Sequence, residues 1–432
     1  MKIFTLLLFI FQLTVVQAQE LLSYMQTQKS IKEITEINGN PFFAHTYQIM
    51  VRQPLNYADT LNGFFMQRVF VAEKQKNNPV VLVTEGYAAH YAVNPSYIEE
   101  LAELLDASQI CVEHRYFGQS IPDSLNWDYL AVSNAANDHH RIVQLFKPYF
   151  EGKWLNTGIS KGGQTALAHR AFFPNDVDLT VAYVAPLNFG VEDGRHEPFI
   201  EKTGLEHDRK AIFNFQLDVL KRRTELVPML KDYCEAKNLH SRMSFDEMLD
   251  YMVLEYPFAF WQWGSPVGNI PTASANTETV FSYLTELSDP GYFTDEGSRH
   301  YQAFFVQAAC ELGYYGYNTK PLKKWLNIKS TSGYLVNYMV PQGAEVSYKP
   351  ETSLKVDAFL KGPARNVVLI YGEVDPWTAS AAVVSADPSN RKIVNPGGSH
   401  KTRISTLPED IQKSLIEDIR ERMECETSTN KN

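Results

Sequence analysis

Short apolar runs alternate with amphipathic helical patterns along most of this chain, and such alternation is compatible with only a few folds. The run at 80–83 is apolar throughout, as expected of a strand that is buried on both faces of a sheet. The predicted strands cover residues 80–83, 110–112, 154–158, 179–184, 367–371 and 392–394. The helical patterns cover residues 94–105, 135–150, 162–173, 378–384 and 408–423. We therefore expect a mostly parallel sheet with right-handed crossovers.

Two further features indicate how the chain is organised around this sheet. Residues 47–52 and 64–72 are rich in β-branched and aromatic side chains and are separated by turn formers, which predicts an antiparallel hairpin before the main sheet. The alternation stops near Pro186 and resumes near Val367, and the residues between them carry helical patterns with many aromatics. We predict a first sheet segment at 19–189, a helical cap at 190–340, a second sheet segment at 341–425 and a disordered tail at 426–432.

The N-terminal segment has the pattern of an export signal. Lys2 is followed by an apolar run at 3–16, and Val16 and Ala18 then supply the small residues that precede a cleavage site. The run is too short to span a bilayer comfortably, and no later run approaches the ~20 apolar residues that a span requires. We expect a signal peptide at 1–18, no membrane span in the mature chain, and a secreted or periplasmic location.

Composition narrows the possible classes of function. The 432 residues are 44% hydrophobic, which is enough for a large core and argues against a disordered chain. The formal net charge of −10 argues against nucleic-acid binding, which would require a basic face. The four cysteines are few for a core of this size, whose stability would not depend on disulfides. A bridge between Cys234 and Cys310 is conceivable, although spacing alone cannot establish it.

A candidate nucleophile lies between a predicted strand and a predicted helix, in the sequence Gly158-Ile159-Ser160-Lys161-Gly162. This G-x-S-x-G pattern is typical of a sharp strand-to-helix turn, where flanking side chains would collide with their neighbours. Such a turn exposes the serine hydroxyl at the carboxyl edge of the sheet. The pattern alone also occurs by chance in roughly one chain of this size in ten, so its structural context and the remaining catalytic residues must support it.

Catalytic partners of Ser160 should follow in the order acid, then histidine, each on a loop after a late strand. Of the eleven histidines, only His400 follows the last two predicted strands, and we expect it to act as the general base. Asp375 follows the penultimate strand and is expected to orient the imidazole and stabilise its charged form. Glu373 and Asp387 are rival acids, but Glu373 is too close to the strand end and Asp387 precedes a proline in an ordinary turn.

The same pattern predicts an oxyanion hole. The backbone N–H of Lys161, at the start of the helix after the nucleophile, points to the place where an oxyanion would form. A second N–H usually comes from the loop after an early strand, here Gly86 or Tyr87, although a plain tight turn explains that loop equally well. Taken together, these features predict an α/β-hydrolase fold, with a mostly parallel sheet and an inserted, mainly helical cap.

No metal or cofactor is expected. His139 and His140 lie on a predicted helix without the spacing or the acidic partner of a zinc site. The sequence also lacks a phosphate-binding glycine loop and a cysteine metal knuckle.

Several segments resemble a known group of peptidases. Residues 113–120, E-H-R-Y-F-G-Q-S, are similar to the E-H-R-Y-[YF]-G-x-S segment of the prolyl carboxypeptidase family. Residues 65–70, 307–315 and 375–377 extend the resemblance over most of the mature chain. The elbow G-I-S-K-G-G and the histidine context G-G-S-H depart from that family. Both look closer to the sister family of bacterial secreted prolyl tri- and tetrapeptidyl aminopeptidases.

This resemblance implies a proline-selective serine exopeptidase that acts on peptides with proline near the N-terminus. It also implies that Ser160, Asp375 and His400 form the triad, in agreement with the reading of the loops. Two alternatives stay open. One is a carboxylesterase or lipase, because a triad does not distinguish an amide from an ester. The other is a catalytically inactive binding protein on a hydrolase scaffold.

A proline-selective exopeptidase needs a flat apolar slot and a group that binds the chain end. Trp377, Tyr314 and Tyr315 are the candidates for the slot. A free amino group requires a buried carboxylate, for which Glu311 is the first candidate and Glu85 the second. Both Trp377 and Glu311 could equally be structural, in core packing or in an ion pair.

Overall fold

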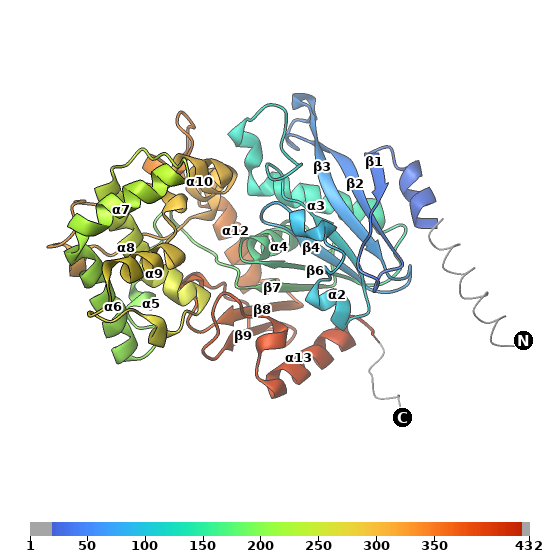
Figure 1. Cartoon of the computed structure of the whole chain (residues 1–432). Coiled ribbons are helices and arrows are strands. Elements are labelled where there is room, and N and C mark those ends of the chain that lie inside the picture. The colour runs from blue at the N-terminus through green and yellow to red at the C-terminus, as the bar shows by residue number, and fades with distance from the viewer. Residues whose placement is uncertain (1–19, 426–432) are drawn as a thin grey trace, which may run out of the picture.

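A nine-stranded sheet lies at the centre of the computed structural model, which describes residues 20–425 (Figure 1). The strands are β1 (Ile31–Glu36), β2 (His45–Pro54), β3 (Phe64–Glu73), β4 (Val80–Thr84), β5 (Ser108–Val112), β6 (Trp154–Ile159), β7 (Leu179–Tyr183), β8 (Val367–Gly372) and β9 (Arg391–Asn395). Their order in the sheet is β1-β2-β3-β5-β4-β6-β7-β8-β9. The pairs from β1 to β5 are antiparallel, and those from β5 to β9 are parallel. The chain therefore has the predicted α/β-hydrolase fold.

Helices cover both faces of this sheet. They are α2 (Glu100–Leu104), α3 (Val132–Phe146), α4 (Lys161–Phe172), α12 (Glu351–Lys361) and α13 (Glu409–Arg422). On β4, Val80 and Leu82 pack in the core that includes α3, whereas Val81 and Val83 pack in the core that includes α2 and α13. Alternate side chains of a strand point to opposite faces, so burial on both faces explains why this strand is apolar throughout.

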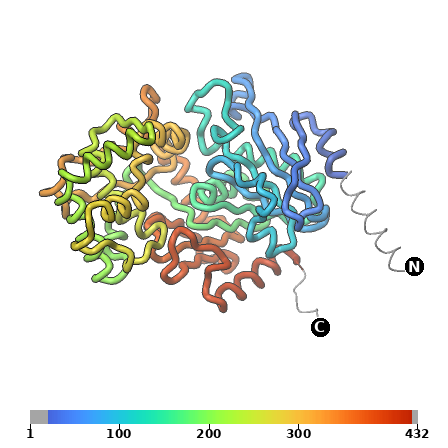
Figure 2. The backbone as a smooth tube through the Cα atoms, in the orientation of Figure 1, coloured from blue at the N-terminus to red at the C-terminus, as the bar shows by residue number. Residues whose placement is uncertain are grey.

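A cluster of helices follows β7 and ends before β8, and we call it the helical cap. It contains α5 (His196–Ile200), α6 (Glu206–Lys221), α7 (Arg223–Ala236), α8 (Phe245–Trp263), α9 (Thr277–Leu287), α10 (Asp295–His300) and α11 (Gln302–Gln307). Figures 1 and 2 show these green to yellow helices gathered to one side of the sheet. The long helix α8 begins at a Ser244–Glu247 capping box and ends at Gly264, whose φ is +66°. The predicted limits of the cap, 190 and 340, stay predictions.

Two predicted helices differ from the structure. Residues 378–384 were expected to be helical, but a 3-10 helix, η9 (Pro376–Ser380), takes their place. It ends early because Ala381 forms a bridge with Pro186 and the carbonyl of Ser380 accepts from the Leu187 N–H at 2.7 Å. The helix expected from residue 94 begins only at Glu100, in α2. The spacing of apolar residues predicted where both segments lie, but it could not predict the tertiary contacts that limit the length of their helices.

Three further expectations can be compared with the described residues. Cys234 and Cys310 are both free thiols, so the conceivable bridge between them is not formed. No helix within residues 20–425 is long and apolar enough to cross a bilayer. Across the same residues there is no group of three His, Cys, Asp or Glu side chains that could hold a metal ion. The predicted signal peptide at 1–18 and the predicted tail at 426–432 lie outside the described residues.

Candidate active site

Ser160 occupies the turn between β6 and α4. Its backbone has φ 55° and ψ −120°, a region that residues with a side chain rarely adopt. The Ser160 N–H donates to the carbonyl of Tyr183 at 2.8 Å, and its own carbonyl accepts from the Gln164 N–H at 2.9 Å, so the turn is held on both sides. Backbone strain of this kind costs on the order of 1–3 kcal/mol and is concentrated at functional sites.

Glycine is required at two positions around this turn because backbone packs directly against backbone. A Cβ on Gly158 would lie 2.3 Å from the carbonyl of Gly162, and a Cβ on Gly86 would lie 2.7 Å from the Gly162 nitrogen. Thr84 Oγ1 donates to the carbonyl oxygens of Thr157 at 3.0 Å and Gly162 at 3.1 Å. The nucleophile turn and the loop after β4 are therefore in contact, as an oxyanion hole built from both would require.

Asp375 and His400 form a buried hydrogen-bonded pair. His400 Nδ1 lies 2.7 Å from Asp375 Oδ2, and the Asp375 side chain has no exposed surface. Asp375 Oδ1 accepts from the Trp377 N–H at 3.1 Å, which helps to orient the carboxylate. The backbone N–H of His400 donates to the carbonyl of Gln262 in α8 at 2.9 Å, so the cap also holds the histidine loop. With Nδ1 engaged, Nε2 is the nitrogen available for a proton from a nucleophile.

The two rival acids have other partners. Glu373 accepts at 2.8 Å from a backbone N–H of the glycine loop that carries His400. Asp387 pairs with Arg365 at 2.6 Å. Asp375 is therefore the acid that the fold places against the imidazole.

Ser160 lines a pocket of about 280 Å³. Most of the lining is aromatic, and three of the predicted substrate residues, Trp377, Tyr314 and Tyr315, are part of it. The centroid of the Trp377 ring lies 5.4 Å from that of Tyr315 and 5.6 Å from that of Tyr314. These walls can bury a flat apolar group next to the hydroxyl.

His400 contacts a residue of the pocket wall, but its link to Ser160 stays a prediction. Trp263 lines the pocket and packs edge-to-face against the His400 imidazole, with ring centroids 6.1 Å apart. Within the described chain, the Ser160 hydroxyl makes no hydrogen bond. In enzymes without substrate, catalytic hydrogen bonds are often long and tighten only in the complex.

The two carboxylates predicted to bind a substrate amine, Glu311 and Glu85, are not among the residues that line this pocket. Glu311 accepts from the Val132 N–H at 2.7 Å and from Thr352 Oγ1 at 2.8 Å, and it thereby joins α3 to α12. Glu85 accepts a hydrogen bond from the Tyr91 hydroxyl. Both acids are occupied by structural contacts, which the spacing of the sequence could not reveal.

Glu255 is a carboxylate of the pocket that no sequence motif indicates. It lies in α8 and accepts from the Tyr315 hydroxyl at 2.9 and 3.0 Å and from the Tyr317 hydroxyl at 2.8 Å. Burial raises the pKa of Glu255 to about 7, and the hydrogen bonds from Tyr317 and Tyr315 oppose this rise. In the sequence, Glu255 stands out only as an acid beside the aromatic run at 256–263. A carboxylate inside an apolar helix needs hydrogen-bond donors to compensate for the water that it loses on burial.

The Lys161 side chain is buried beneath the loop after β4. Its Nζ donates to the Gly86 carbonyl at 2.5 Å and lies 5.4 and 5.0 Å from the ring centroids of Tyr87 and Phe117. Burial lowers the pKa of Lys161 well below its usual range, and the nearby Glu85 opposes this effect. In a trans peptide the C=O and N–H point in opposite directions. The hydrogen bond to the Gly86 carbonyl therefore also sets the direction of the Tyr87 N–H.

Residues 113–120, the E-H-R-Y-F-G-Q-S segment, fold as a buried polar scaffold beside this loop. Glu113 accepts from the Ala89 N–H at 2.9 Å and so holds the loop after β4. Arg115 forms a bidentate pair with Asp138, with both contacts at 2.7 Å and both side chains fully buried. The segment contributes no side chain to the pocket lining. The segment therefore supports the loop after β4, and the residues that line the pocket of Ser160 come from other parts of the chain.

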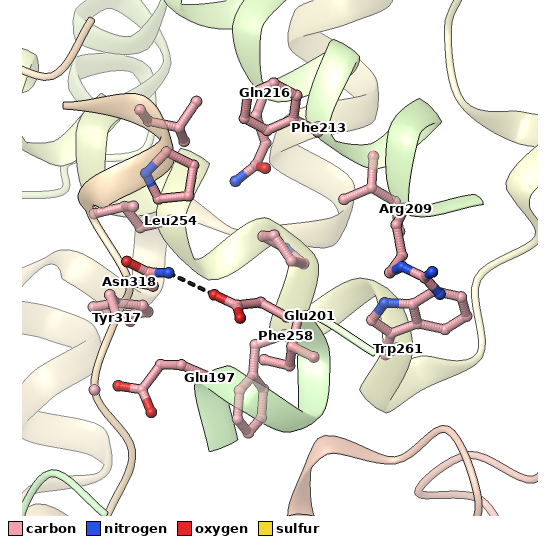
Figure 3. A pocket seen from close by; sticks show the side chains of 16 residues that line it. Glu197, Glu201, Arg209, Phe213, Gln216, Leu254, Phe258, Trp261, Tyr317 and Asn318 are labelled. Carbon is pink, nitrogen blue, oxygen red and sulfur yellow. Dashed lines mark hydrogen bonds between the residues drawn. The ribbon is translucent and has the colours of Figure 1, made fainter. Parts of the chain in front are cut away.

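A second pocket, of about 270 Å³, lies on the other face of α8 (Figure 3). Leu254 and Phe258 line this second pocket, whereas their neighbour Glu255 lines the pocket of the nucleophile. Glu201, the residue that follows α5, also lines the second pocket, and its carboxylate accepts from the Asn318 side chain at 2.6 Å, as Figure 3 shows. No residue of the predicted triad belongs to this lining.

Known proteins resemble the chain over most of its length. The model of a family described as PS-10 peptidase S37 matches residues 19–420. A prolyl tri/tetrapeptidyl aminopeptidase from Streptomyces mobaraensis is 30% identical over 386 residues, which are 87% of this chain and 79% of that protein. Lysosomal Pro-X carboxypeptidases match over shorter segments. The Bos taurus protein is 25% identical over 42% of this chain and 40% of its own length, and the Homo sapiens protein is 30% identical over 28% of each.

Proposed function

Since this chain belongs to the PS-10 peptidase S37 family, we propose that it is a secreted exopeptidase that releases short N-terminal peptides by cleavage after proline. Membership of the family makes it a serine peptidase. The observation that carries the proposal is the position of Ser160 in an aromatic pocket whose wall contacts the buried His400–Asp375 pair. Similarity to an aminopeptidase over most of the chain supports release from the N-terminus, and the export pattern at 1–18 supports secretion.

In the proposed reaction, the Ser160 hydroxyl attacks the carbonyl carbon of the proline that precedes the scissile bond. His400 Nε2 takes the hydroxyl proton, while Asp375 holds the Nδ1 proton and stabilises the imidazolium. The tetrahedral intermediate collapses when the C–N bond breaks and His400 passes its proton to the leaving amine. Water then attacks the prolyl ester on Ser160 by the same proton transfers, which releases the N-terminal peptide and restores the hydroxyl.

We assign the oxyanion hole to the backbone N–H groups of Lys161 and Tyr87. Lys161 is the first residue of α4, where helix N–H groups lack intrahelical partners and carry partial positive charge. The Gly86 N–H interacts with the Glu85 carboxyl, which favours Tyr87 over Gly86 as the second donor. The Lys161 side chain then acts on the reaction indirectly, because it orients the peptide that carries the Tyr87 N–H.

Lys161→Met is expected to lower kcat about 100-fold, since a donor that is displaced or lost at an oxyanion hole has an effect of this size. Methionine keeps the side-chain length between the Tyr87 and Phe117 rings but cannot donate to the Gly86 carbonyl. Steady-state kinetics with Lys413→Met, an exposed lysine of α13, as control would measure the change. An increase in KM at unchanged kcat would contradict the assigned role.

The aromatic wall formed by Trp377, Tyr314 and Tyr315 supports selectivity for proline, whose ring is compact and apolar. We expect kcat/KM for an Ala-Ala-Pro anilide to exceed that for an Ala-Ala-Ala anilide by about 100-fold, because filling or emptying an apolar pocket changes kcat/KM by up to this amount. Both rates would be measured together with hydrolysis of a nitrophenyl ester. An enzyme that hydrolyses the ester but neither anilide would be an esterase, and the proposed function would be wrong.

A further inference from the structure

We infer that Glu255 binds the α-ammonium group of the substrate, in the same pocket as the nucleophile. The ligand class is a protonated primary amine at the end of a peptide chain. The inference rests on the proposed exopeptidase function and names the residue that makes the enzyme select a free N-terminus.

The charges of the pocket favour an ammonium group over a carboxylate. Glu255 and Asp289 both line it, and none of its described lining residues is Lys, Arg or His. A carboxypeptidase must hold a free carboxylate, for which proteins use cationic donors such as arginine. In this pocket a terminal carboxylate would be repelled, whereas a terminal ammonium would be attracted. The electrostatics therefore match the aminopeptidase relative rather than the carboxypeptidase relatives.

Of the two acids, Glu255 is the better anchor. Asp289 accepts from the Gly291 N–H at 2.8 Å and so caps the short helix η5 (Pro290–Phe293). A carboxylate has about four acceptor sites, and Tyr315 and Tyr317 contribute three contacts to Glu255. At least one site stays available for an incoming N–H. The same hydroxyls fix the direction of the carboxylate, so little side-chain freedom is lost when the amine binds.

The protonation state of Glu255 makes the selection depend on pH. Burial raises its pKa to about 7, so the free enzyme carries the anionic, binding-competent form mainly above that pH. The tyrosines around it, Tyr292, Tyr314, Tyr315, Tyr317 and Tyr334, all have a pKa raised further above 10 by burial, so they stay neutral there. Asp289, the other acid of the pocket, faces the same space. A peptide α-amine is protonated below about pH 8, which places the strongest selection between about pH 7 and 8.

Glu255→Gln tests the inference through one ratio, the kcat/KM for a free Ala-Ala-Pro anilide divided by that for its N-acetylated form. We expect the wild-type ratio to be about 30 or more and the Glu255→Gln ratio to approach 1, because loss of one partner of a buried charge pair has an effect of this size. Glu255→Asp keeps the charge and should retain part of the ratio. Glu201→Gln, the same change in the second pocket, is the matched control and should keep the wild-type value.

The ratio separates this inference from the proposed function. Fluorophosphonate labelling of Glu255→Gln shows whether the nucleophile is still assembled, and kcat/KM for the acetylated substrate shows how much of any loss is unrelated to the ammonium contact. In the wild type the ratio should rise as pH increases from 6 to 7.5, and any pH dependence of the catalytic step cancels because both substrates share that step. A Glu255→Gln enzyme that keeps the wild-type ratio, or loses both activities equally, would overturn the assignment of Glu255. A wild type that cleaves neither substrate would instead refute the proposed function.

Discussion

Ser160→Ala is expected to lower kcat about 10⁶-fold, the size of loss that follows removal of a serine nucleophile from an assembled triad. Among the described residues, Ser160 alone lies on the strained turn between β6 and α4 with a hydroxyl in the aromatic pocket. Alanine at this position therefore removes the group that attacks the substrate. KM should change little, because the pocket walls that bind the substrate stay intact. The rates would be measured with the Ala-Ala-Pro anilide, and a fluorophosphonate should label the wild type but not the variant.

Ser282→Ala provides the matched control for this substitution. Ser282 is exposed on α9 and its side chain has no role in the proposed reaction. The Ser282→Ala enzyme should react with the fluorophosphonate and hydrolyse the anilide as fast as the wild type does. Stoichiometric labelling of Ser160→Ala at another residue would show that the nucleophile lies elsewhere, and the assignment of the whole triad would then be wrong.

Asp375→Asn is expected to lower kcat about 10⁴-fold, while the enzyme keeps its fold. The carboxylate accepts from His400 Nδ1 at 2.7 Å and from the Trp377 N–H at 3.1 Å. An amide can reproduce the geometry, but its NH₂ group directed at the imidazole favours the tautomer with the proton on Nε2. That tautomer cannot take the proton of Ser160, and the imidazolium also loses its stabilising charge.

Two carboxylate variants distinguish this effect from a general loss of charge near the site. Asp387→Asn removes a surface pair with Arg365 and should leave kcat within a few-fold of the wild type, because exposed ion pairs contribute little. Glu373→Gln weakens the support of the glycine loop and should have an intermediate effect. If Asp375→Asn retained more than about a tenth of the wild-type kcat at neutral pH, Asp375 would not be the orienting acid.

Several elements follow from local features of the chain and were predictable without tertiary information. The apolar runs at 80–83 and 367–371 must be buried on both faces, and strand β4 packs against helices on both sides. The turn at Ser160 needs glycine at 158 because the backbone there contacts the backbone of Gly162. The G-x-S-x-G motif predicts a glycine at this position. Chain order then places Asp375 and His400 on loops after late strands, where the two side chains meet.

The partners of charged side chains depended on tertiary packing, which no local pattern encodes. Glu311 and Glu85 have the chemistry of an amine-binding acid, yet their carboxylates are engaged by Val132, Thr352 and Tyr91. Glu255 lines the pocket because α8 presents alternate faces to two cavities, and its rotation is set by long-range packing. Sequence therefore determined the strands and the turn at Ser160, which arise from short-range backbone constraints, and the chain order of the three candidate catalytic residues. Only the tertiary structure decided which carboxylate lines the pocket of Ser160, because that depends on contacts between residues far apart in the chain.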